Sequence, residues 1–81
     1  MKDLFEKRSD KDRLWDWMLE QKYIKTSMVI KWGVYNFSNR ALRNSRELAN
    51  EHKDIIRKLE FEEKERLFGR IKEDVWAVEI T

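Results

Sequence analysis

The sequence has no cysteine and no proline, and its 81 residues include only two glycines and one histidine. The missing cysteines exclude disulfide bonds and thiolate zinc sites, and His52 alone cannot form a metal cluster. Because no proline, Gly/Ser-rich linker or internal repeat marks a boundary, we expect one domain over residues 1–81. Within it, residues 1–9 are expected to form an N-terminal arm or a short helix.

Long apolar runs are missing as well. No stretch approaches the roughly 20 apolar residues that a membrane span needs, and no signal-peptide pattern opens the sequence, so we expect a soluble, cytoplasmic protein without a membrane partner. The sequence also has no Gly-rich phosphate loop, nucleophile elbow or clustered carboxylate motif. We therefore expect no enzymatic activity, no cofactor, no metal and no small-molecule substrate.

Charge is abundant but unevenly distributed. Charged residues make up 42% of the chain, and the formal net charge is only +2. Residues 21–46 carry six Lys or Arg and no Asp or Glu, whereas residues 1–20 have a net charge of −1 and residues 47–81 a net charge of −3. An acid-free basic segment inside an otherwise acidic chain is typical of an anion-binding surface.

Hydrophobic periodicity predicts two helices before residue 38. The first begins at Ser9 or Asp10 and ends near Tyr23, and the second begins at a cap formed by Thr26 or Ser27. Apolar residues at helical spacing are more often core than binding residues, so we expect these side chains inside: Leu14, Trp15, Trp17, Met18 and Leu19 from the first helix; Val29, Ile30, Trp32, Gly33, Tyr35 and Phe37 from the second.

A third helix is predicted over about residues 38–52, capped by Ser38 or Asn39. Gly33 in the preceding helix is expected either to permit close helix packing or to mark the end of that helix, and Asn36 suits a left-handed turn residue. The expected inner face of the third helix consists of Ala41, Ser45, Leu48, Ala49 and His52, with the histidine as a core or helix-end residue. Its outer face carries Asn39, Arg43, Arg46 and Asn50.

The period changes after residue 54, where residues 55–59 and 75–80 are predicted to be strands. The second strand places Trp76, Val78 and Ile80 on one face, and an acidic helix over residues 61–68 lies between the strands and ends at Gly69. The predicted class is therefore α+β, with three helices followed by a two-stranded antiparallel hairpin that carries a helical insert.

The segment of residues 26–33 (TSMVIKWG) is followed further along the chain by residues 39–48 (NRALRNSREL) and then by a hydrophobic strand. In this order of elements and these residues, the chain resembles the winged helix-turn-helix family, in particular small stand-alone members from viral and prokaryotic genomes. It departs from the family pattern in the four residues 34–37 that delay the third helix, and in the acidic insert of the hairpin, the wing of that family.

The resemblance implies sequence-specific binding of double-stranded DNA by a small transcriptional regulator in a prokaryotic or virus-infected cell, with the third helix in the major groove. Arg matches guanine and Asn matches adenine, because their donors and acceptors pair bidentately with those base edges. The implied base contacts are Asn39, Arg40, Arg43, Asn44 and Arg46. The implied phosphate contacts are Lys25, Ser27, Lys31, Ser38, Arg70 and Lys72.

Other interpretations of the basic face stay open. It also suits a winged-helix adaptor or inhibitor that binds an acidic protein, or it is only the solvated face of a small helical bundle. Arg43 with Glu47 is equally consistent with a weak surface ion pair, and Asn39 with a helix cap. A homodimer is a further expectation, formed through Leu4 and Phe5 or through Phe61, Leu67 and Phe68.

Overall fold

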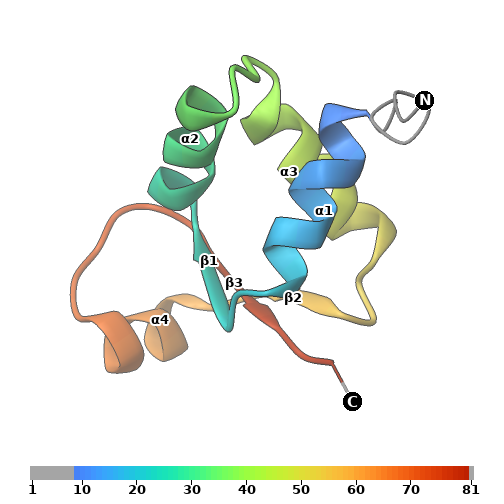
Figure 1. Ribbon diagram of the computed structural model, residues 1–81. Helices are drawn as coiled ribbons and strands as arrows, with labels where there is room; N and C mark the ends of the chain where they lie inside the picture. Colours follow the sequence, from blue (N-terminus) through green and yellow to red (C-terminus); the bar gives the residue numbers. More distant parts are fainter. Residues whose placement is uncertain (1–8, 81) are drawn as a thin grey trace, which may run out of the picture.

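A computed structural model describes residues 9–80, so Leu4, Phe5 and most of the expected N-terminal arm lie outside the described residues. The described part is a small α+β domain of four helices and one three-stranded sheet (Figure 1). The predicted class is confirmed, but the sheet has one strand more than the predicted hairpin. The elements are α1 (Asp10–Leu19), β1 (Tyr23–Lys25), α2 (Thr26–Tyr35), α3 (Ala41–Glu51), β2 (Ile56–Lys58), α4 (Phe61–Phe68) and β3 (Val75–Val78).

The additional strand is β1, which lies between α1 and α2. The sheet has the order β1-β3-β2 and is antiparallel, with Tyr23 opposite Ala77 and Ile56 opposite Val78. The first helix therefore ends at Leu19 rather than near Tyr23. Three residues are too few to show a strand period in the sequence, and β1 exists because the central strand β3 offers it a second edge.

The start of α1 follows the predicted capping chemistry. The Ser9 hydroxyl accepts a 3.1 Å hydrogen bond from the backbone N–H of Asp12, which satisfies one of the free donors of the first turn. One helical turn apart, Leu14 and Met18 are both buried, whereas Trp15 and Trp17 pack partly buried against the same cluster. The predicted apolar stripe of this helix is confirmed.

The predicted caps of the next two helices are wrong. Lys25 is the N-cap of α2, and the Thr26 hydroxyl donates instead to the Asp74 carbonyl oxygen at 3.3 Å. The helix α3 begins at Ala41 after an Arg40 N-cap without a side-chain hydrogen bond, so residues 38 and 39 belong to the preceding turn. In both cases the chain arriving from the neighbouring element, rather than a capping side chain, sets the start of the helix.

The turn between α2 and α3 is tight at Gly33. A Cβ atom on this residue would lie 2.7 Å from the Ser38 carbonyl oxygen and 2.9 Å from the Ala41 Cβ atom. The prediction of close packing at this glycine is therefore confirmed. The left-handed residue is Phe37, with φ of 55°, and not Asn36, whose amide donates instead to the Trp32 carbonyl oxygen at 2.9 Å.

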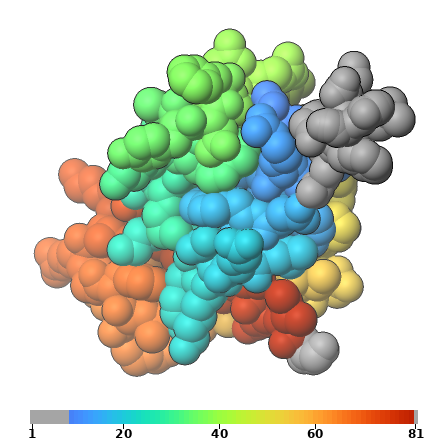
Figure 2. All heavy atoms as spheres, in the orientation of Figure 1, coloured from blue at the N-terminus to red at the C-terminus, as the bar shows by residue number. Residues whose placement is uncertain are grey.

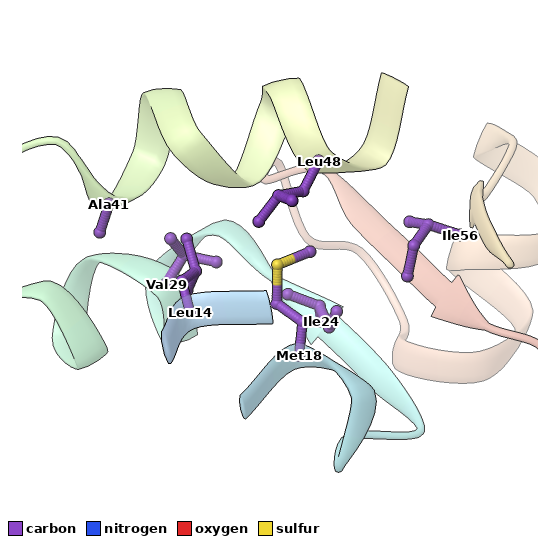
Figure 3. Close-up of a cluster of buried hydrophobic side chains, with 7 residues drawn as sticks. All are labelled: Leu14, Met18, Ile24, Val29, Ala41, Leu48 and Ile56. Atoms are coloured by element: carbon purple, nitrogen blue, oxygen red, sulfur yellow. The ribbon is translucent and has the colours of Figure 1, made fainter. Parts of the chain in front are cut away.

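The core lies where α1, α2 and α3 meet the sheet. Figure 3 shows Leu48 of α3 directed toward Met18 of α1 and Ile24 of β1. Other members of this cluster are Leu14, Val29, Ala41 and Ile56. The predicted inner face of α3 is confirmed for Ala41, Ser45 and Leu48, which are buried. His52 stacks on Trp15 with ring centroids 4.2 Å apart, as expected of a helix-end histidine.

The hairpin of β2 and β3 carries α4 on the opposite face of the sheet. Val75 and Ala77 pack with Leu59 and the partly buried Phe68 in a second cluster, whereas Trp76 and Val78 face the first cluster. The predicted shared face of Trp76 and Val78 is confirmed, but Ile80 lies beyond the strand and is exposed. The predicted end of α4 at Gly69 is also confirmed.

Candidate nucleic-acid interface

The exposed side of α3 carries a row of long polar side chains. Arg43, Arg46 and Asn50 are exposed and recur at intervals of three and four residues, so they share one side of the helix. The exposed Lys53 lies in the turn after α3 and lines the same hollow as Arg46 and Asn50. The opposite side packs into the core through Ser45 and Leu48. We call Arg43, Arg46, Asn50 and Lys53 the outer stripe. In Figure 1, α3 lies behind α1, against which it packs.

A groove continues the outer stripe toward the hairpin. It has a volume of about 410 Å³ and lies between the second half of α3 and strand β2. Its floor is apolar and includes the buried Ile56, whereas exposed cations surround it. The floor consists of Ala49, Ile56 and Trp76, and the surrounding cations are Arg46, Lys53, Arg57 and Lys58.

Two of these four cations are partly neutralised. Arg57 donates to the Glu63 carboxylate at 2.8 and 3.1 Å and to Glu79 at 3.1 Å, which raises the Arg57 pKa and lowers the pKa of Glu63. Lys58 Nζ lies 3.6 Å from an Asp74 carboxylate oxygen. Within residues 9–80, no carboxylate lies within ion-pair distance of Arg46 or Lys53, so these two cations are the ones available to an anionic ligand.

The acidic side chains of α3 lie toward α1, where a single lysine pairs with both of them. Lys11 Nζ is 3.1 Å from the Glu51 carboxylate and 3.2 Å from that of Glu47. The hydrogen bond from Lys11 to Glu51, and to a smaller extent the one to Glu47, raises the Lys11 pKa. The same lysine lowers the Glu47 pKa. The outer stripe therefore keeps a positive field on the side of Arg46 and Lys53.

The structure brings together only some of the predicted base contacts. Arg43 and Arg46 lie on the outer stripe, although Arg43 Nε also lies 3.5 Å from the Glu47 carboxylate, the surface pair that the sequence suggested. Asn39 and Arg40 are exposed in the turn before the helix. Asn44 is half-buried and lies about 160° around the helix axis from Arg46, so it does not belong to the same surface.

The first turn of α2 is not the open phosphate site that the sequence predicted. The backbone N–H of Ser27 donates to the Glu73 carboxylate at 2.7 Å, so an acid of the same chain occupies this helix end. Lys25 Nζ lies 4.7 Å from the centroid of the Phe68 ring and is drawn toward the hairpin. Lys31 is exposed on the helix, as a phosphate contact would require.

Of the remaining predicted phosphate contacts, one side chain is buried and two are exposed. Ser38 is 6% exposed, and its hydroxyl oxygen is shielded from solvent, so this prediction is wrong: the contact between α2 and α3 buries it. Arg70 and Lys72 are exposed, but they line a separate pocket with Phe61 and Ile71 beside α4. Hairpin residues 70–72 are therefore a second basic surface and not an extension of the groove.

Sequence reasoning missed Asn50 and Lys53 as site residues, together with Lys58. Asn50 was placed on the outer face of the third helix but was not proposed as a contact, whereas Lys53 follows the end of the helix, where helical spacing no longer applies. It also wrongly assigned Ile30, Tyr35 and Phe37 to the core, and all three are exposed. Trp32 was assigned correctly, since it packs beside Trp17 with centroids 6.2 Å apart.

Over residues 9–80, no helix is long and apolar enough to cross a membrane, and no group of three or more His, Asp or Glu side chains could hold a metal ion. No family model matches the chain, and neither a curated protein nor a solved structure is similar to it. Any functional inference therefore depends on the geometry and charge described above.

Proposed function

We propose that this chain is a winged-helix protein that binds double-stranded DNA sequence-specifically, as a small transcriptional regulator, with α3 in the major groove. The observation that supports this proposal is the outer stripe, a row of exposed Arg, Asn and Lys side chains on the side of α3 that faces away from the core. The β2–β3 hairpin, which follows α3, is the counterpart of the family's wing.

The dimensions of the stripe suit the major groove. From Arg43 to Asn50 the helix rises about 10 Å, which corresponds to roughly three base pairs of B-DNA. The groove is about 12 Å wide and admits one α-helix. A helix in this position would present Arg43, Arg46 and Asn50 to the base edges and Lys53 to a phosphate.

Each side chain of the stripe has a distinct task. The guanidinium groups of Arg43 and Arg46 can donate two parallel hydrogen bonds to guanine O6 and N7. The Asn50 amide can pair with adenine N6 and N7 in the same bidentate way. Lys53 supplies a point charge for the phosphate backbone, which positions the protein without reading sequence.

The test is a charge reversal of the stripe. The parent should bind random-sequence duplexes with an affinity that falls steeply with salt, and selection from random duplexes should enrich a short motif of about three base pairs per protomer. A triple variant with Arg43→Glu, Arg46→Glu and Lys53→Glu should lose this binding and keep its helical circular dichroism.

The matched control carries Arg13→Glu, Lys22→Glu and Arg66→Glu. It has the same net charge as the stripe variant, and all three residues are exposed and lie outside the groove and the stripe. It should keep most of the DNA affinity, because only the general attraction to DNA is reduced. If the two variants lose affinity equally, α3 is not the interface and the proposal is wrong.

A further inference from the structure

The helix α2 exposes a second surface that DNA binding does not explain. Ile30, Val34 and Phe37 are spaced by four and three residues along α2 and the turn after it, and they are 51%, 70% and 94% exposed. Nothing in the described part of the chain covers them. Soluble proteins rarely expose such contiguous apolar side chains without a partner, so this row calls for a functional explanation.

These side chains form one wall of a groove between α2 and the start of α3. The facing wall is Leu42, and the buried Gly33 and Ala41 lie at the floor. The groove has a volume of about 500 Å³ and is open to solvent. In Figures 1 and 2 the chain that joins α2 to α3 forms the upper edge of the molecule, on the side away from the sheet. A rod-shaped partner can therefore approach the groove without meeting the hairpin.

The backbone conformation of Phe37 is a second indication that this surface was not selected for the stability of the fold. Its φ of 55° is a left-handed conformation in which Gly or Asn is less strained than an aromatic residue. The ring gains no packing in return, because it is almost fully exposed. Residues that are strained and unpacked in this way concentrate at binding sites, where contact with a partner compensates for the strain.

Charge identifies the kind of partner. The groove lies within residues 21–46, which contain no Asp or Glu, and the exposed Lys31 and Arg40 lie beside the apolar row in sequence. A second copy of the chain that presented the same surface would bring these cations against their own counterparts, which is unfavourable. A partner with carboxylates around an apolar ridge would be attracted instead.

We propose that this groove binds an acidic amphipathic helix of a partner protein. Apolar side chains at positions i, i+4 and i+7 of that helix would pack against Val34, Phe37 and Leu42, as in other helix-in-groove complexes. Its flanking carboxylates would face Arg40, which adjoins Asn39 and Ala41 of the groove lining, and would be attracted by Lys31 on the same helix as Val34. A helix of three turns buries less area than a stable protein complex requires, so this contact is a transient one with an affinity on the order of micromolar.

The contact differs from the proposed DNA contact, because its apolar residues are Val34, Phe37 and Leu42, whereas the outer stripe begins at Arg43 and continues along α3. The two surfaces adjoin, since Asn39 and Leu42 also line the hollow beside Arg43 and Arg46, but the variants that test them share no residue. The two proposals therefore fail separately, and each has its own variants.

The experiment is a selection from a displayed library of helical peptides. Each peptide carries three large apolar residues at positions i, i+4 and i+7, and its flanking positions are randomised among Asp, Glu, Lys, Arg, Gln and Ser. We expect the selected peptides to be acidic at the flanks. Their affinity should fall at least tenfold when the target protein carries Val34→Ser with Phe37→Asn, and asparagine suits the positive φ at that position.

The control variant carries Leu67→Ser with Ile80→Ser, which removes two exposed apolar side chains from other surfaces and should leave peptide binding unchanged. A charge-swapped variant with Lys31→Glu and Arg40→Glu should reject the acidic peptides and select basic ones. It tests the same groove without altering any apolar contact.

Three results would overturn the proposal: no enriched peptide, enriched peptides without acidic flanks, or binding that Val34→Ser with Phe37→Asn does not weaken. If that variant weakens the binding of random duplexes instead and no peptide is selected, the apolar row is part of a nucleic-acid contact. A loss of DNA binding on reversal of the outer stripe leaves the result for the groove unaffected.

Discussion

The backbone N–H of Ser27 donates a 2.7 Å hydrogen bond to the carboxylate of Glu73, across 46 positions of sequence. The contact joins the first turn of α2 to the loop that leads into β3. The neighbouring Thr26 strengthens it, since its N–H and its hydroxyl both donate to the Asp74 carbonyl oxygen. A helix N-terminus favours negative charge, and here the chain supplies that charge itself.

Removal of the Glu73 charge should have opposite effects on stability and on DNA binding. Glu73→Gln keeps a hydrogen-bond acceptor but loses the interaction with the helix dipole, so the free energy of unfolding should fall by about 0.3–1 kcal/mol. The same change removes a negative charge from beside the first turn of α2 and should therefore tighten duplex binding several-fold. Urea denaturation and duplex titration measure the two effects. Glu62→Gln, which removes an equal charge from exposed α4, should not tighten binding to the same extent.

Gly33→Ala should destabilise the protein although alanine is the better helix former. The new Cβ atom would lie 2.7 Å from the Ser38 carbonyl oxygen, a backbone atom that cannot move without shifting the turn. Overpacking of this kind lowers the free energy of unfolding by about 1–3 kcal/mol. Val34→Ala on the same helix is the control and should change it by less than about 0.5 kcal/mol, because Val34 is exposed. Equal melting temperatures for the two variants would contradict the close packing.

Gly69→Ala tests a different property of glycine. No atom lies within 4 Å of the position a Cβ would take, so there is no clash to relieve. Its φ of 76° and ψ of −158° nevertheless belong to a region that only glycine enters readily. We expect a loss of about 1–3 kcal/mol in chemical denaturation. An unchanged midpoint would show that this turn adopts another backbone conformation in solution.

The ion pair between Arg57 and Glu63 should appear in the acid limb of the stability curve. Hydrogen bonds from Arg57 hold the Glu63 pKa below its ordinary value of 4.5 in the folded protein. The unfolded chain therefore binds the proton more tightly, and the stabilisation is present above pH 4.5 and lost as pH falls through the folded pKa. Arg57→Gln should raise the Glu63 pKa, measured by NMR titration, and flatten this part of the curve. An unchanged Glu63 titration would contradict the contact.

If the outer stripe binds DNA, Lys53→Ala should change the salt dependence of binding more than the sequence preference. Loss of one phosphate contact lowers the slope of log affinity against log salt by about 0.9. Lys22→Ala is the control, because it removes an exposed lysine from the turn before β1, at the opposite edge of the sheet from β2. Equal slopes for Lys53→Ala and the parent would exclude Lys53 from the phosphate contacts.

Much of the secondary structure could be predicted because local patterns encode it. The cap at Ser9, the periodicity of α3 and the glycine after α4 each rest on interactions within a few residues. Strand β1 could not be predicted in this way, since its three residues acquire their conformation by pairing with β3, about 50 positions away. The start of α2 is similar, because its nearest acid comes from the loop before β3.

The sequence indicated some of the residues of the candidate site, but not how far the site extends. The acid-free segment drew attention to Arg43 and Arg46, and the structure shows that both side chains are exposed. The sequence could not show that Ser38 is buried by the packing of α2 on α3, or that Asn44 lies on another side of the helix from Arg46. Lys53 was not proposed because it lies outside the acid-free segment, in the turn after the end of α3.

By itself, the amino-acid sequence determined the order of most elements, the side chains that share a helix face, and the concentration of positive charge in the middle of the chain. Only the tertiary structure decided which apolar faces are covered. Periodicity places Val29 and Ile30 on neighbouring parts of one helix, yet the first is fully buried and the second half exposed. The difference arises because burial depends on where α1, α3 and the sheet lie around α2, and those contacts join residues far apart in the chain.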